Sequence, residues 1–260
     1  MTEVTSEAGP VKVARVRSAP LVFSAGSLVG LLGGMIGLGG AEFRLPLLIG
    51  MFGFAALSAV ILNKAMSLVV VITALPARLA AVPFGELGSH WAIAVNLLAG
   101  SLLGAWAGAS WALRMRSATL YKVLAILMVA MATAFVFTHT TAVGSLTLPT
   151  SVQVVAGVAA GFGVGVVAAI MGVAGGELLI PTIVLLYGAD IKLAGSLSLL
   201  VSLPTVLVAF ARYSRDGSFA VLGNNLRFAA LMATGTRPRR GRRSRGGVPG
   251  RGRSAGRDRP

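Results

Sequence analysis

Residues 37–46 read GLGGAEFRLP, and residues 172–181 read GVAGGELLIP. Glycine, glutamate and proline residues of the first stretch recur in the second, always at the same separation along the chain. We call this separation, which is that between Gly37 and Gly172, the repeat offset. The other pairs at the repeat offset are Gly40 and Gly175, Glu42 and Glu177, Pro46 and Pro181, Gly26 and Gly161, Gly30 and Gly165, Gly53 and Gly188, Ala59 and Ala194, and Ser67 and Ser202. Chance enrichment in glycine would not keep one offset over such a stretch, so the sequence predicts an internal duplication.

The composition around the duplicated stretch is that of a membrane protein. Of the 260 residues, 55% are hydrophobic and only 12% are charged, whereas ordinary soluble domains carry about 25% charged residues. The chain has no cysteine, which excludes disulfides, thiolate metal sites and cysteine nucleophiles. With only His90 and His139 as histidines, we expect no metal, no cofactor and no catalytic residue, and therefore no enzyme.

Apolar runs divide the chain into candidate membrane helices. A first run begins at Leu21 and is too long and glycine-rich for a cleaved signal peptide. Further runs cover residues 43–56, 59–80, 91–112, 119–138, 151–173, 178–189 and 192–211. The runs at 43–56 and 178–189 are short and contain Pro46 and Pro181, which is typical of the discontinuous helices of transporters.

Basic residues favour an orientation with the N-terminus in the cytoplasm. When both short runs are counted as crossings, only Arg78 and Lys192 fall clearly outside, as the positive-inside rule requires. The cytoplasmic basic residues are then Lys12, Arg15, Arg17, Arg114, Arg116, Lys122, Arg212 and Arg215. If each short run instead enters the membrane and returns to the same side, the group from Arg114 to Lys122 lies outside. The positive-inside rule therefore favours two crossings.

Five crossings then separate the two copies, and this odd number predicts repeats of opposite orientation. The expected fold is an all-α polytopic transmembrane bundle with two inverted repeats and broken helices at the glycine-rich motifs, which places a substrate site near the midplane. The expected units are a cytoplasmic segment 1–19, a first repeat 20–139, a loop 140–150, a second, truncated repeat 151–236 and a disordered Arg/Gly-rich tail 237–260.

The repeated motif has the composition of a backbone anion site. Its glycines let the chain leave a helix, its proline suits the first turn of a new half-helix, and the free amide groups there attract anions. The predicted substrate-binding residues are Gly37, Gly39, Gly40, Glu42, Pro46, Gly172, Gly175, Gly176, Glu177 and Pro181. Close helix packing is the alternative role for glycine, and it is favoured for Gly26, Gly30, Gly100, Gly104 and Gly108.

Several polar side chains at membrane depth have two interpretations. Glu42 and Glu177 either couple protons to the anion or favour their own helix N-termini. Lys64 is either a substrate cation or, the favoured interpretation, a snorkelling lysine near the interface. Arg44 does not face Glu42 at a spacing of two. Ser196, Ser198 and Ser202 line a polar cavity or, more commonly, bond neighbouring backbone.

The two motifs resemble the duplicated glycine-rich signature of the TauE/SafE family of sulfite exporters, over roughly residues 20–235. Ala41 and Ala174 stand where that signature has glycine. The resemblance implies an inner-membrane, multi-pass permease for sulfite, sulfonates or related organosulfur anions, with the anion and the lipid bilayer as partners. The alternatives are a passive anion channel and a non-transporting membrane assembly protein.

The last residues differ in composition from the rest of the chain. Ten of the 23 basic residues lie between Arg237 and Arg259, and without residues 237–260 the chain has 13 basic and 7 acidic residues. The rest of the chain therefore gives no reason to expect nucleic-acid binding. Residues 219–234 read like the beginning of another span, so a frameshift in a GC-rich gene is favoured over a disordered tail near anionic lipid.

Overall fold

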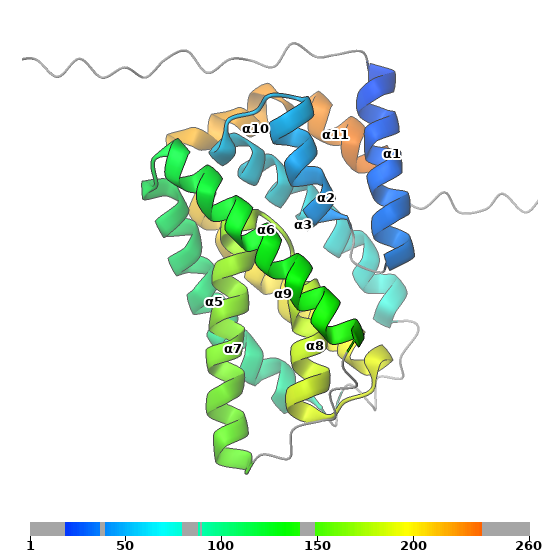
Figure 1. Ribbon diagram of the computed structural model, residues 1–260, viewed down its shortest axis with the longest axis vertical. Helices are drawn as coiled ribbons and strands as arrows, with labels where there is room; N and C mark the ends of the chain where they lie inside the picture. The colour runs from blue at the N-terminus through cyan, green and yellow to red at the C-terminus, as the bar shows by residue number, and fades with distance from the viewer. Residues whose placement is uncertain (1–18, 37–39, 80–87, 89, 141–148, 236–260) are drawn as a thin grey trace, which may run out of the picture.

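The computed structural model of the chain describes residues 19–36, 40–79, 88, 90–140 and 149–235, and all regular secondary structure within these ranges is helical (Figure 1). The predicted all-α class is therefore confirmed. The helices are α1 Ala19–Ile36, α2 Ala41–Pro46 with the π-helical turn η1 Leu47–Met51, α3 Ala56–Leu79, α5 Trp91–Arg114, α6 Ser117–Thr140, α7 Thr150–Met171, α8 Gly176–Tyr187, α9 Ile191–Ser214, η2 Gly217–Phe219, α10 Ala220–Asn224 and α11 Leu226–Gly235.

Four of the helices are long and apolar enough to cross a membrane within the described residues, namely α3, α5, α7 and α9. The surface of the bundle is also apolar, as a bilayer requires. Leu103 of α5 is 66% exposed, and Ile126 and Val129 of α6 are 66% and 67% exposed. Exposed apolar side chains of this size suit contact with lipid tails, so the predicted transmembrane bundle is confirmed.

Glycines bring α5 and α7 into close contact along their whole length. A Cβ atom on Gly100, Gly104 or Gly108 would lie under 3.0 Å from a backbone atom of α7. These three glycines face Val158, Phe162 and Val166 in that order, so the two helices run parallel. The packing interpretation of these glycines is confirmed, as small residues at helix interfaces in membranes predict.

Helix α9 runs parallel to α5 on another side of the bundle. The hydroxyls of Ser101 and Thr205 lie 2.8 Å apart, and Arg212 Nε donates to Ser110 Oγ at 2.8 Å. Helix α8 runs the other way, because Gln153 Nε2 near the start of α7 donates to Leu186 O at the end of α8 at 2.6 Å. Helices α7 and α8 therefore form a hairpin.

This hairpin corrects the predicted crossing of the run 178–189. Helix α8 has 12 residues, about 18 Å at 1.5 Å per residue, which is shorter than a hydrocarbon core of about 30 Å. It begins part-way along α7 and returns toward the start of α7. A hairpin returns the chain to the side of the membrane where α7 began, and so would two crossings. The predicted side of every later loop is therefore unchanged.

Helices α1 and α2 form a second hairpin. A Cβ on Gly40, which directly precedes α2, would lie 2.6 Å from Val29 O in α1. A straight helix would separate residues 29 and 40 by about 16 Å, so the chain doubles back between them. In Figure 1 this hairpin occupies the upper half of the bundle, whereas α7 and α8 occupy the lower half.

Contacts between helices also recur at the repeat offset. Gly161 of α7 packs against the carbonyl of Leu97 in α5, and Gly26 of α1 packs against the carbonyl of Met232 in α11. The step from Gly26 to Gly161 and the step from Leu97 to Met232 both equal the repeat offset. Helix α11 thus lies on α1 as α5 lies on α7. The run 219–234 is not one continuous span, since α10 ends at Asn224 and α11 begins at Leu226.

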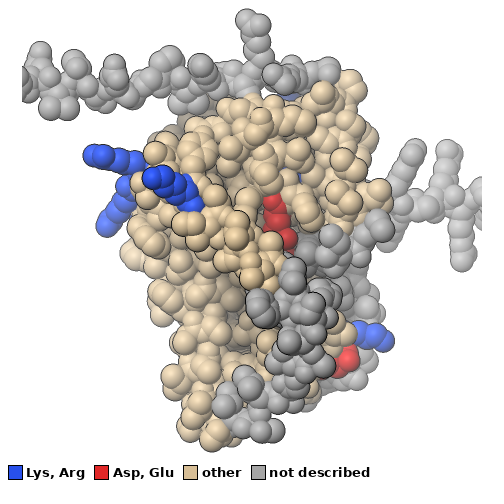
Figure 2. Space-filling view, viewed as in Figure 1, with Lys and Arg blue, Asp and Glu red and all other residues tan. Residues whose placement is uncertain are grey.

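Charged side chains gather at the ends of the bundle. Figure 2 shows Lys and Arg side chains at the upper left and the lower right of one face, and an acidic side chain on the surface between them. Arg114 ends α5, Arg116 lies between α5 and α6, and Lys122 lies near the start of α6, while Asp190 and Lys192 lie at the start of α9. Apart from that acidic side chain, the tan surface between the two ends can contact lipid at little electrostatic cost.

Candidate functional site

Both broken helices restart at a glycine in the left-handed region. Gly40 has φ 74° before α2, and Gly175 has φ 85° before α8. Gly172, which ends α7, has φ 71°. L residues with side chains rarely adopt such angles. The prediction that glycine lets the backbone leave the helix is therefore confirmed at these three positions, whereas Gly37 and Gly39 lie outside the described residues.

The second break folds back onto the helix that precedes it. A Cβ on Gly175 would lie 3.0 Å from Ala168 Cβ and 3.4 Å from Val164 Cγ1. At Gly40 the corresponding neighbour is Val29, which the repeat offset pairs with Val164. Helices α2 and α8 therefore both begin beside an interior turn of α1 or α7.

The start of α8 lies near the middle of α9. A Cβ on Gly176 would lie 3.7 Å from Ser202 Oγ and 3.8 Å from Ser198 Oγ. Since α9 is a full-length membrane span of 24 residues and Ser202 is close to its centre, the first amides of α8 lie at mid-membrane depth. The first amide of α8 that bonds a main-chain carbonyl is that of Leu178, which donates to Gly175 O at 3.2 Å. The N–H groups of Gly175 and Glu177 donate to the Glu177 carboxylate instead.

The prolines do not occupy the predicted first turn. Pro46 and Pro181 are each the sixth residue of their helices, so this expectation is wrong. At that position proline removes the helical N–H that would pair with the carbonyl four residues earlier. The carbonyls concerned belong to Glu42 and Glu177, so both paired glutamates lose a backbone hydrogen bond, and a π-helical turn follows Pro46.

Three polar residues of α3 hold the end of α7 in place. Lys64 Nζ donates to Ala168 O at 2.9 Å and to Val173 O at 2.7 Å. Asn63 Nδ2 donates to Met171 O at 3.2 Å and also to Ala41 O of α2 at 3.0 Å. Ser67 Oγ donates to Gly172 O at 3.2 Å. The donors to Met171 O, Gly172 O and Val173 O satisfy carbonyls at the end of the helix, whereas Ala168 O also accepts from the N–H of Val173 at 3.1 Å.

The favoured interpretation of Lys64 as a snorkelling lysine is wrong. Its side chain is 0% exposed, and its ammonium group reaches the end of another helix instead of the membrane interface. The positive charge lies where the α7 dipole is negative, which is favourable. Asn63, Lys64 and Ser67 thus link α3 to the break between α7 and α8.

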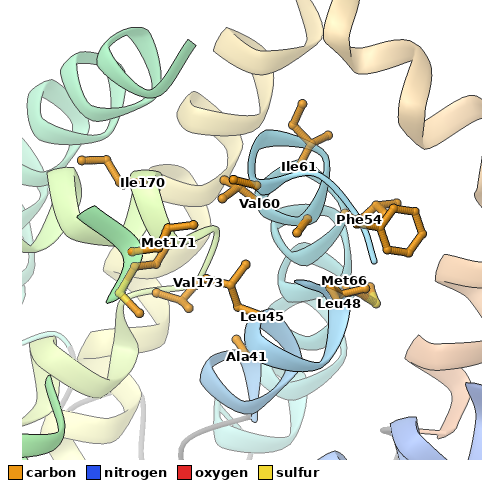
Figure 3. Packing of buried hydrophobic residues seen from close by; sticks show 14 of the residues in the cluster. Ala41, Leu45, Leu48, Phe54, Val60, Ile61, Met66, Ile170, Met171 and Val173 are labelled. Atoms are coloured by element: carbon orange, nitrogen blue, oxygen red, sulfur yellow. The ribbon is translucent and has the colours of Figure 1, made fainter. Parts of the chain in front are cut away.

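Apolar packing closes this junction around the polar contacts. In Figure 3 the side chains of Leu45, Val60 and Val173 converge where α2, α3 and the end of α7 meet. Leu45 and Val60 are fully buried, as is Val173. Such packing lowers the local dielectric constant and strengthens the electrostatic interactions inside.

A charged cluster lies within the same junction. Glu177 interacts electrostatically with Glu42, Arg44 and Lys64. Arg44 is 0% exposed and Glu177 is 5% exposed, whereas Glu42 is partly exposed. The buried polar atoms with no hydrogen-bond partner among the described residues are Glu42 Oε1, Arg44 Nε and Nη1, Asn63 Oδ1, Glu177 Oε2 and Ser202 Oγ.

The three serines of α9 divide between the two interpretations. Ser196 Oγ donates to Lys192 O at 3.3 Å, and Ser198 Oγ donates to Gly195 O at 2.9 Å, so both bond their own helix as the commoner interpretation expects. Ser202 Oγ is buried without a partner in the described part of the chain. Ser202 is therefore the serine that is available to line a polar site.

The structure joins the predicted Glu42 and Glu177 in one cluster and adds Arg44, Asn63, Ser67 and Ser202 to it. These four residues carried little weight or none in the predicted site. A signal was present, because the repeat offset pairs Asn63 with Ser198 and Ser67 with Ser202. No group of three or more His, Asp or Glu side chains that could hold a metal occurs among the described residues.

An all-helical bundle with several membrane spans, broken helices and a buried charged cluster at mid-depth is the architecture of a multi-pass membrane permease. The family model for the sulfite exporter TauE/SafE matches residues 22–237. The chain belongs to this family of membrane permeases for sulfur-containing anions, and it is a transport protein. No curated protein and no solved structure gives a significant match to it.

Proposed function

We propose that this chain is a secondary transporter that carries sulfite, a sulfonate or a related organosulfur anion through a site at the junction of α2, α3, α7 and α8. The observation that carries the proposal is the buried cluster of Glu42, Arg44, Lys64 and Glu177 at the two helix breaks. Charges at membrane depth are costly and mark substrate or ion pathways. Transport, not catalysis, is the activity proposed.

The site combines backbone and side-chain donors. The start of α8, with its positive dipole end, attracts an anion, and Ser202 Oγ lies beside it. The proposed substrate-binding residues remain those of both motifs, Gly37, Gly39, Gly40, Glu42, Pro46, Gly172, Gly175, Gly176, Glu177 and Pro181. Of these residues, Gly40, Gly172 and Gly175 are buried in protein, where irregular backbone is tolerated at membrane depth.

Two inverted repeats, 20–139 and 151–236, form the two sides of this site in the proposal. The contacts that recur at the repeat offset support the duplication. Three helices, α3, α5 and α6, separate the two hairpins in the described part of the chain. If each crosses the membrane, their odd number makes the hairpins enter from opposite sides, so that rocking of one repeat against the other exposes the site alternately.

The proposed location is the inner (plasma) membrane, with the N-terminus in the cytoplasm. Arg114, Arg116 and Lys122 lie around the turn between α5 and α6, and Arg212 and Arg215 lie at the end of α9. Helices α5 and α9 are parallel, so both basic groups lie at the same end of the bundle. The positive-inside rule assigns that end to the cytoplasm.

Uptake into proteoliposomes tests the function. We expect the purified full chain to accumulate radiolabelled sulfite or methanesulfonate above the external concentration when a pH gradient is imposed, because a coupled carrier uses the gradient. Equilibration without accumulation would identify a passive anion channel. Failure to bind or move either anion would favour a non-transporting membrane assembly protein and contradict the proposal.

A further inference from the structure

Arg44 is a fully enclosed guanidinium whose donors are mostly unused. Its side chain is 0% exposed, and Nη2 donates to Ser67 Oγ at 3.5 Å. Nε and Nη1, which carry three of the five guanidinium N–H donors, have no partner among the described residues. Buried guanidinium groups are normally paired with a carboxylate or another acceptor.

Lys64, the other buried cation of the cluster, is already occupied. Its Nζ donates to two main-chain carbonyls at 2.9 Å and 2.7 Å, which fixes the end of α7. Because an ammonium group has three donors, at most one remains for a ligand. Arg44 therefore has the larger unused capacity for hydrogen bonds to an anion.

The charged groups around Arg44 come from three helices. Glu177 of α8 attracts it electrostatically, and Glu177 also interacts with Lys64 of α3 and with Glu42 of α2. Glu177 Oε2 has no hydrogen-bond partner within the described residues. Glu177 thus supplies a nearby negative charge while leaving Arg44 Nε and Nη1 unbonded.

We propose that Arg44 is the residue that recognises the transported oxyanion, and that Glu177 acts as its counter-charge when no anion is bound. The ligand class is a small anion with several sulfur-bound oxygens, such as sulfite or a sulfonate. A planar guanidinium can donate to two oxygens of one such anion at once, whereas an ammonium group acts as a point charge. The inference rests on the proposed transport of such anions.

Anion binding by the full chain in detergent tests the inference, with sulfite and methanesulfonate as probes in calorimetric titrations. Arg44→Gln should weaken binding by about tenfold to a hundredfold, the loss of charge-assisted hydrogen bonds. Arg44→Lys, which keeps the charge and loses the planar fork, should also weaken it. Glu177→Gln should retain binding and strengthen it, since the competing charge is gone.

Arg212→Gln is the matched control. Arg212 is also a helix arginine bonded to a serine hydroxyl, at 2.8 Å to Ser110, but it lies at the far end of α9. Its substitution should leave the affinity within about twofold of the wild type, as expected for a remote site. Arg44→Gln that binds like the wild type would overturn the inference while the proposed function stands.

Two further outcomes keep the tests distinct. If Arg44→Gln does not fold, Arg44→Lys and Glu177→Gln decide, and wild-type affinity in both would overturn the role of Arg44. No binding of either probe by the wild-type chain would overturn the proposed function and this inference together.

Discussion

Lys64 shows how a single buried side chain fixes a helix break. It supplies hydrogen bonds to Ala168 O and Val173 O from a position inside α3. Its charge is stabilised by the end of α7 and by Glu177. The residue is thus part of the framework around the proposed anion site.

Replacement of Lys64 by Met should therefore lower stability. The change leaves the buried carbonyl of Val173 without its donor, at about 1–3 kcal/mol for an unsatisfied group, whereas Ala168 O keeps the N–H of Val173 as a donor at 3.1 Å. Thermal unfolding of the detergent-solubilised protein checks this, with Lys192→Met as the control because Lys192 is exposed at the start of α9. Equal unfolding temperatures for the two variants would contradict the assigned role.

Substitution of Glu42 and Glu177 distinguishes proton coupling from stabilisation of a helix start. Glu42→Gln or Glu177→Gln keeps the size of the side chain but cannot titrate, so a coupling residue should lose the response of uptake to a pH gradient while anion binding persists. A glutamate that only favours its helix start should instead lower the unfolding temperature. Wild-type pH dependence in both variants would exclude both from coupling.

At the scale of the element, the break depends on glycine. Gly175→Val should abolish transport, because φ 85° is strained for a β-branched residue and its Cβ would crowd Ala168. Gly40→Val should do the same at φ 74°. Uptake assays check both, and unaltered transport by the two variants would reduce these glycines to packing residues.

Gly163→Val is the control for those variants, because Gly163 lies in the same helix α7 and a Cβ there meets nothing within 4 Å. It should be tolerated apart from the small helix-propensity difference between Gly and Val. Loss of transport in this control would show that substitution of any glycine in the hairpin is harmful.

The glycine contact between α5 and α7 makes a separate prediction. Gly104→Ile should prevent the close approach of the two helices, because the new side chain would clash with the main chain of Phe162. Overpacking of this kind lowers the free energy of unfolding by about 1–3 kcal/mol or more. We expect a lower unfolding temperature than for Gly163→Ile. The same unfolding temperature in both variants would argue that the contact contributes little.

Hydropathy and glycine patterns predicted most helices and both breaks, because each depends on nearby residues. These patterns did not predict three features. The burial of Lys64 depends on its contact with the end of α7, which is distant in sequence. The position of Pro46 and Pro181 in the second helical turn depends on where their helices begin, at Ala41 and Gly176. The return of α8 along α7 depends on tertiary contacts such as that of Gln153 with Leu186.

At the scale of the whole molecule, the absence of cysteine from the 260 residues makes the topology measurable. Ser117→Cys and Ser214→Cys should react with an impermeant thiol reagent only after the membrane is permeabilised, since both exposed positions lie at the proposed cytoplasmic end. Thr150→Cys should react from outside. Ser117 and Thr150 labelled from one side would contradict the crossing of α6.

The cluster of cations does not follow the duplication. The repeat offset pairs Arg44 with Leu179 and Lys64 with Leu199, so that within the described residues the buried cations of the junction, Arg44 and Lys64, both come from the first half of the chain. A perfectly symmetric carrier would present equivalent sites to the two compartments. Here the two faces need not have the same half-saturation concentration, although microscopic reversibility leaves the gradients alone to set the direction of net flux. In the proposed carrier, the asymmetric placement of two side chains would give a kinetic polarity that an exact duplication of the backbone would lack.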